Sequence, residues 1–194
     1  MFKPALLTGN TARVARTMAV TAALLFIPLA QPVLAQQVTM ETLLDRIQIE
    51  DLLVKYYYDL TMSRAHSMSE YFTEDAMLDV DGTIANGRAE IENLYGGGNG
   101  RDANAAPQPH NHMLLTNPVI TVKGNTAMAH VVWTGIKNSG VGSAPSLYEQ
   151  GREDTELAKV NGQWLIKRRY ISSDSGTPDR FDETYVAREN PLGD

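Results

Sequence analysis

The sequence predicts an α+β domain in which N-terminal helices cover one face of a curved antiparallel sheet. Apolar residues recur at helical spacing through residues 39–60, and four long segments with strand-like alternation occupy residues 112–172. Helices that precede a run of strands are typical of the α+β class. The strands alone would expose one apolar face, so the helices must cover it. A curved sheet wrapped over helices leaves a conical cavity with one open end, where a pocket is expected.

The first half of the domain is expected to supply the helices and a small hairpin. The apolar face of the first helix, which Thr39 can cap, is formed by Leu43, Ile47, Leu53, Tyr57 and Leu60 and widened by Ile49, Leu52 and Tyr56. The pattern then predicts a short helix at 67–72, a strand at 76–80, a brief strand at 83–85 and a third helix at 88–95. Asp81-Gly82 is typical of a tight hairpin turn between the two strands.

The second half is expected to form a four-stranded antiparallel meander. Its strands are predicted at 112–122, 126–137, 148–160 and 164–172, with hairpin turns at 123–125 and 161–162. A glycine-rich stretch at 96–109 precedes them and is expected to be a loop that could close over a ligand.

Residues 1–35 have the plan of a secretory signal peptide. Three basic residues precede an apolar run at 18–30, and Val33 and Ala35 stand at the minus-three and minus-one positions of a cleavage site before Gln36. The alternative is a membrane anchor, but Pro28 interrupts the run, which is shorter than the roughly 20 residues that span a bilayer. We therefore expect one domain at 36–172, a tail at 173–194, and a secreted, periplasmic protein that has no membrane attachment after cleavage.

Charge and cysteine content exclude several classes of protein. Removal of the three basic residues of the leader leaves 14 basic and 23 acidic side chains, a net charge of −9. An acidic domain without a basic stripe is a poor nucleic-acid binder. The chain contains no cysteine, so thiol chemistry and lipid attachment through cysteine are excluded.

Several short motifs occur in an order and spacing that resemble one family. They lie at 49–56 (IEDLLVKY), 71–76 (YFTEDA), 112–114 (HML), 117–120 (NPVI), 151–152 (GR) and 161–164 (NGQW). In this order the chain resembles the SnoaL-like branch of the nuclear transport factor 2-like superfamily, from about Met40 to Ser172. The resemblance implies an α+β cone, a homodimer or homotrimer, and relatives that include dehydratases, ketosteroid isomerase, polyketide cyclases and members without catalysis. Fold therefore does not decide function.

The resemblance also implies a site. The helix tyrosine of the family's dehydratases falls on Tyr56 and the strand histidine on His112, whereas the usual aspartate position falls on Thr61. Asp59, three residues after Tyr56, could replace that aspartate. A histidine can transfer a proton near neutral pH, and a tyrosine can donate to a developing oxyanion. The alternatives are a strand histidine satisfied by the backbone, a core tyrosine and a solvated aspartate.

Other candidates follow from the strand pattern. Alternation places Gly151, Glu153, Thr155 and Leu157 on one face, and Leu157 suggests that this face is the interior. Glu153 would then either pair with a buried arginine or act as a base with a raised pKa, unless it lies at a polar mouth or dimer surface. Further candidates for substrate contact are Thr61, Arg88, His110, Trp133 and Tyr148. No third ligand lies at an obvious spacing from His110 and His112, so no metal is expected, although Glu153 and Asp154 are candidates for such a ligand.

These observations predict a cofactor-independent lyase, of the dehydratase or carbon–carbon elimination type, acting on a hydrophobic hydroxylated aromatic or polycyclic molecule. His112 would be the general acid or base, Tyr56 the oxyanion donor, and Asp59 or Glu153 the second carboxylate. A ketosteroid-isomerase-like proton transfer and a non-catalytic small-molecule-binding domain are the alternatives.

Overall fold

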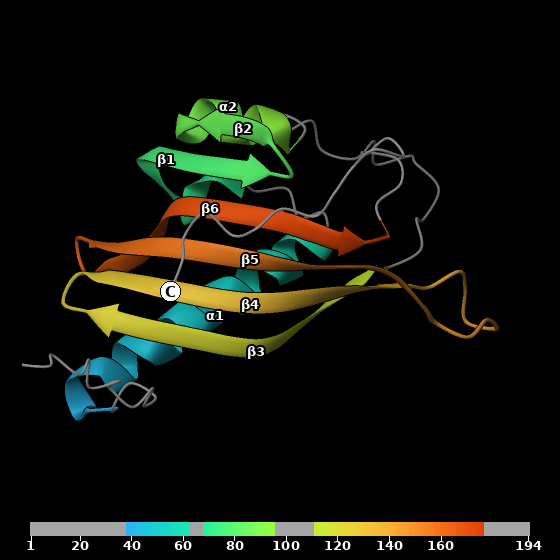
Figure 1. Cartoon of the computed structure of the whole chain (residues 1–194), viewed down its shortest axis with the longest axis horizontal. Coiled ribbons are helices and arrows are strands. Elements are labelled where there is room, and N and C mark those ends of the chain that lie inside the picture. Colours follow the sequence, from blue (N-terminus) through green and yellow to red (C-terminus); the bar gives the residue numbers. More distant parts are fainter. Residues whose placement is uncertain (1–37, 63–67, 96–110, 177–194) are drawn as a thin grey trace, which may run out of the picture. The chain divides into compact units, whose positions relative to one another are not determined.

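The structure is a computed structural model that describes residues 38–62, 68–95 and 111–176 (Figure 1). All of them lie within one compact unit, Gln36–Asp194. In chain order the elements are α1 (Met40–Met62), a 3-10 turn η1 (Met68–Tyr71), β1 (Phe72–Val80), β2 (Thr83–Asn86), α2 (Gly87–Leu94), β3 (His112–Lys123), β4 (Thr126–Lys137), β5 (Ser146–Val160) and β6 (Gln163–Ser175). Among the described residues, no helix is long and apolar enough to cross a membrane.

The sheet is larger than the predicted four-stranded meander. It has six strands in the order β2-β1-β6-β5-β4-β3, and β3 to β6 form the predicted antiparallel meander. The difference is that β1 pairs in parallel with β6, which adds the β1–β2 hairpin to the same curved, unclosed sheet. The predicted turn is confirmed, because Asp81 and Gly82 adopt φ angles of 53° and 93°.

Helix α1 covers the inner face of the sheet. In Figure 1 it crosses behind β3 to β5. Its buried stripe runs through Ile49, Leu53, Tyr56 and Tyr57, a spacing that keeps these side chains on one face. Ile49 and Leu53 pack in a cluster with residues of β3 to β6, including Leu157. The two tyrosines pack with residues of β1, β4, β6 and α2.

The first turns of α1 differ from the prediction. Leu43 and Ile47 are exposed, at 37% and 47% of their surface. The face turned to the sheet there carries Asp45 and Arg46 instead, because Asp45 accepts hydrogen bonds from Lys159 and Trp164 and Arg46 donates to a backbone carbonyl of β3. Polar contacts therefore replace apolar packing at this end of the helix.

Candidate functional site

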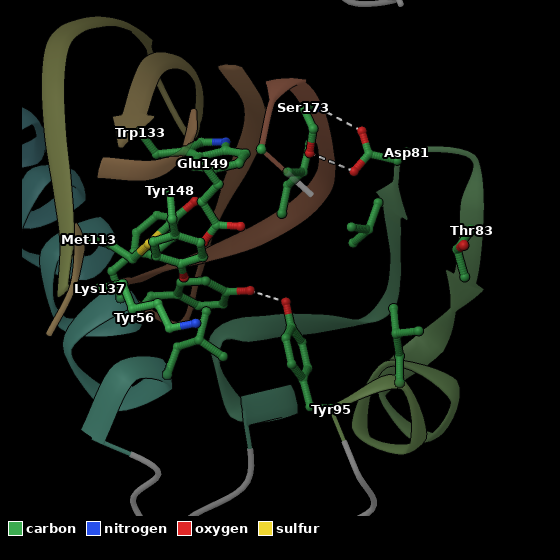
Figure 2. A pocket seen from close by; sticks show the side chains of 16 residues that line it. Tyr56, Asp81, Thr83, Tyr95, Met113, Trp133, Lys137, Tyr148, Glu149 and Ser173 are labelled. Atoms are coloured by element: carbon green, nitrogen blue, oxygen red, sulfur yellow. Dashed lines mark hydrogen bonds between the residues drawn. The ribbon is translucent and has the colours of Figure 1, made fainter. Parts of the chain in front are cut away.

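A cavity of about 820 Å³ lies between the second half of α1, the end of α2 and the inner face of the sheet. Figure 2 shows the side chains that line it, which come from α1 and from both halves of the sheet. Much of its wall is aromatic, formed by Tyr56, Tyr57, Tyr95, Trp133 and Tyr148. Such a wall suits a flat hydrophobic molecule, because aromatic side chains offer large apolar faces with few polar atoms.

Two tyrosine hydroxyl groups meet inside this cavity. Tyr56 is supplied by α1 and Tyr95 directly follows α2, and their hydroxyl groups share a hydrogen bond (Figure 2). Burial raises the pKa of Tyr56 and raises that of Tyr95 well above the ordinary phenol value. Both phenols are therefore protonated at neutral pH, and the pair can donate a hydrogen bond to an oxygen of a bound molecule.

A β-bulge in β5 places two consecutive side chains on the cavity wall. The register between β4 and β5 shifts from Gly135↔Glu149 to Ile136↔Leu147, so Tyr148 is the extra residue. Tyr148 and Glu149 both line the cavity as a result. Gly135 leaves the space they occupy, because a Cβ atom there would lie 2.5 Å from Cγ of Glu149 and 2.7 Å from Cε1 of Tyr148.

The charged groups on the cavity wall differ in how they are held. Asp81 is fixed by Ser173, whose backbone N–H and hydroxyl donate to its two carboxylate oxygens at 2.7 and 2.9 Å. Glu149 and Lys137 also line the cavity, and neither forms a hydrogen bond or ion pair with any residue that the structure describes. Glu149 is thus a carboxylate on the cavity wall that no described residue holds.

A buried ion pair, Arg169 with Glu153, lies beneath Tyr56 and Tyr57. Arg169 and Glu153 bond to each other with their side chains fully buried, and the Tyr57 hydroxyl donates to the same carboxylate oxygen. Burial disfavours the charge on Arg169, but Glu153 and the neighbouring tyrosines raise its pKa well above the ordinary value. The guanidinium group also lies 4.0 Å from the centre of the Tyr56 ring. The ion pair therefore contacts Tyr56 and Tyr57 from the core side of the cavity wall.

The structure brings three of the predicted residues to the cavity and one to the layer beneath it. Tyr56, Trp133 and Tyr148 line the cavity. Glu153 faces the interior as its alternation predicts, and of the two roles considered for it the structure shows the pairing with a buried arginine. Because both Arg169 and Tyr57 bond to it and it does not line the cavity, it is not placed to act as a base on a ligand there.

His112 is not at the cavity, contrary to the prediction. On β3 the side chains of Met113 and Leu115 pack against the core, so alternation turns His112 and Leu114 to the outer face. His112 is exposed and does not line the cavity. His110 lies outside the described residues.

Three other predicted residues serve the scaffold. Asp59 is buried away from the cavity and bonds to Lys55 at 2.5 Å and to Tyr71. The Thr61 hydroxyl donates to the Tyr57 carbonyl at 2.9 Å within α1. Arg88 ties α2 to β1, because it donates to the Phe72 carbonyl at 2.8 Å and to Glu74 at 2.7 Å.

The polar wall residues that the sequence analysis missed include Glu149, Lys137, Asp81 and Tyr95. Glu149 continues the alternation Glu153–Gly151 by one more step, and Lys137 continues that of Trp133, so the pattern could have found both. Asp81 was assigned only to a turn. Tyr95 reaches the cavity from the end of α2, and no local signal in the sequence indicates this. The structure shows no cluster of three or more metal-binding side chains within the described ranges.

The curved sheet over helices, with an aromatic cavity at its open end, defines a small-molecule enzyme or binding domain of the nuclear transport factor 2-like class. Residues 41–170 match the sequence model of the SnoaL-like domain. The chain therefore belongs to the SnoaL-like family. A search of curated proteins finds no match.

Solved structures with the same fold come from several bacteria. A Novosphingobium aromaticivorans protein named "Putative Scytalone Dehydratase" is 22% identical, with a TM-score of 0.56, over 79% of this chain and 96% of that one. An NTF2-like protein with a cystatin-like fold from the same species is 24% identical, with a TM-score of 0.56, over 72% and 88%. A Nostoc punctiforme protein of unknown function with a cystatin-like fold is 19% identical, with a TM-score of 0.58, over 71% and 96%. These similarities show the fold.

Proposed function

We propose that the cavity is the active site of a cofactor-independent lyase that removes water from a hydrophobic cyclic hydroxy-carbonyl compound. The observation that carries the proposal is the pair of protonated phenols, Tyr56 and Tyr95, in the same cavity as the uncommitted carboxylate of Glu149. A weak base and a preorganised oxyanion donor are together sufficient for proton abstraction next to a carbonyl group.

The proposed reaction has two steps. Glu149 takes a proton from the carbon next to the carbonyl group, and the electron pair moves to the carbonyl oxygen, to which the bonded pair of Tyr56 and Tyr95 donates a hydrogen bond. The enolate then re-forms the carbonyl group, a carbon–carbon double bond forms, and the hydroxyl group on the β-carbon leaves. That hydroxyl group accepts the proton held by Glu149 and departs as water, which restores the carboxylate.

The aromatic wall supports the substrate class. Trp133 and Tyr148 can pack against a ring system, and the volume of about 820 Å³ accommodates a molecule with more than one ring. The name of the Novosphingobium relative, "Putative Scytalone Dehydratase", agrees with a reaction that removes water.

Purified protein incubated with a panel of cyclic β-hydroxy ketones, without added metal or cofactor, tests the proposal. Mass spectrometry should show loss of water from at least one member. Glu149→Gln should lower kcat by about 100-fold or more, and Tyr56→Phe by about 100-fold to 1000-fold. Tyr58→Phe is the matched control, because Tyr58 lies on the same helix but is exposed. Turnover that is unaffected by both cavity substitutions would refute the assignment.

A second candidate is an isomerase that makes the same enolate and returns the proton to another carbon. It is favoured by the outer position of His112, because a carboxylate and a tyrosine suffice for this reaction and no described histidine lines the cavity. Deuterium uptake from heavy water without loss of water, followed by separation of isomers, would identify this activity. Binding without either change would instead identify a ligand-binding domain.

A further inference from the structure

Lys137 lies on the inner face of β4, at the open end of the cone. Val131, Trp133 and Gly135 alternate inward along this strand and are buried, and Lys137 follows two residues later. It lines the cavity, and Figure 2 shows its side chain extending from β4 on the side of Tyr56. Lys137 is itself exposed at the end of the strand, and alternation places it on the same face as the three buried residues, at the cavity wall.

No residue that the structure describes compensates the charge of Lys137. It is the one basic side chain among the described residues that line the cavity, and it forms no ion pair or hydrogen bond with a described residue. Of the other nearby charges, Asp81 is bound by Ser173 and Arg169 is paired with Glu153 beneath the wall, whereas Glu149 lines the same cavity but forms no ion pair with Lys137. A basic group that faces a ligand cavity without a counter-ion provides a position for an anionic group of the ligand.

We propose that Lys137 is an anion subsite, and that the ligand is a cyclic hydrophobic molecule that carries a carboxylate. The inference rests on the proposed function, since it takes this cavity as the ligand site. The ring system would pack on Trp133 and Tyr148, and the carboxylate would bind the Lys137 ammonium group. A single negative charge fits best, because the one lysine offsets one charge and Glu149 on the same wall disfavours a second.

Because the chain is acidic overall, a preference for an anionic ligand depends on a local cation such as Lys137. With 17 basic and 23 acidic side chains, the protein as a whole repels anions. A preference for an acid over its neutral ester would therefore have to come from a local cation, and the preference should weaken as salt screens the interaction.

Direct binding of a matched pair of probes tests the subsite without requiring turnover. The probes are 2-naphthoate and its methyl ester, which share one ring system, measured by calorimetry at low salt. We expect the wild-type protein to bind the acid about fivefold more tightly than the ester, the effect of one partly exposed ion pair. Lys137→Met should abolish this preference and leave the affinity for the ester unchanged, whereas Lys137→Arg should keep the preference.

Lys123→Met is the matched control, because Lys123 is an exposed lysine at the opposite end of the sheet, beside the β3–β4 turn. It should behave as the wild type. An equal affinity for acid and ester in the wild type, a preference that survives in Lys137→Met, or failure of both probes to bind would overturn the subsite. The Glu149 and Tyr56 variants test the chemistry separately, so ester binding with no acid preference overturns the subsite alone.

Discussion

The guanidinium group of Arg169 lies 4.0 Å from the centre of the Tyr56 ring and 5.2 Å from that of Tyr57. A fully buried positive charge therefore stands directly behind the phenol whose hydroxyl group faces the cavity. Burial raises the pKa of Tyr56, and Arg169 opposes this rise. The ion pair with Glu153 keeps the charge in place, so the core and the surroundings of the cavity tyrosines depend on the same arginine.

Loss of this arginine should be costly to stability. Arg169→Met leaves the Glu153 carboxylate buried without its ion-pair partner, and we expect the free energy of unfolding to fall by about 3–5 kcal/mol. The double variant Arg169→Met, Glu153→Gln removes both charges and should recover part of that loss. Urea unfolding of the two variants measures the difference, and equal destabilisation would contradict the pairing.

The buried phenols should make stability depend on alkaline pH. Burial raises the pKa of Tyr56, Tyr57 and Tyr95, so the folded state holds these protons more tightly than the unfolded state. Their contribution is fully present below the ordinary tyrosine pKa of about 10 and is lost as the pH rises from there through the raised values. Urea midpoints should therefore decline above about pH 10. Tyr95→Phe should show a shallower decline, and an unchanged slope in that variant would contradict the assignment.

Gly135 should be required for the position of the bulge residues. An alanine Cβ would come within 3 Å of both Tyr148 and Glu149, so Gly135→Ala should displace these side chains and lower turnover about tenfold or more, as misplacement of a catalytic group does. Gly142→Ala is the control, since its added Cβ meets nothing within 4 Å. Steady-state kinetics of both variants decides the point, and full activity in Gly135→Ala would show that Glu149 is not the base.

A substitution of His112 tests which candidate site is correct. The site predicted from the sequence contains this residue, and the cavity in the structure does not. Because its side chain lies on the outer face of β3, His112→Ala should keep turnover within about twofold of the wild type. The same assay on the substrate identified for the wild type measures it. A large loss of activity with normal folding would restore the histidine to the mechanism.

The expected signal peptide gives a further prediction that needs no substrate. We expect the full-length chain, expressed in a bacterium, to be exported and cleaved between Ala35 and Gln36. The intact mass of periplasmic protein checks this. Substituting arginine for Ala35 should block cleavage, whereas an unprocessed wild-type chain would support the membrane-anchor alternative.

Local patterns predicted most of the secondary structure but not how β1 joins the sheet. The long strands, the Asp81-Gly82 hairpin and the buried face of β5 all follow from alternation and turn residues, which act between neighbours in the chain. The parallel pairing of β1 with β6 was not predicted, because it joins segments about 90 residues apart and no sequence pattern within either segment indicates it.

The sequence alone determined the fold class, the family resemblance and the interior position of Glu153, because each depends on periodicity or on motif order. Tertiary structure decided what that interior position does: Arg169 and Tyr57 bond to the Glu153 carboxylate, and the carboxylate on the cavity wall without a described partner is that of Glu149. It also moved the site away from His112 and toward Tyr95, since the side of a strand that faces the helices is decided by core packing. Which groups meet in a cavity depends on contacts between distant segments, and only the folded chain brings these together.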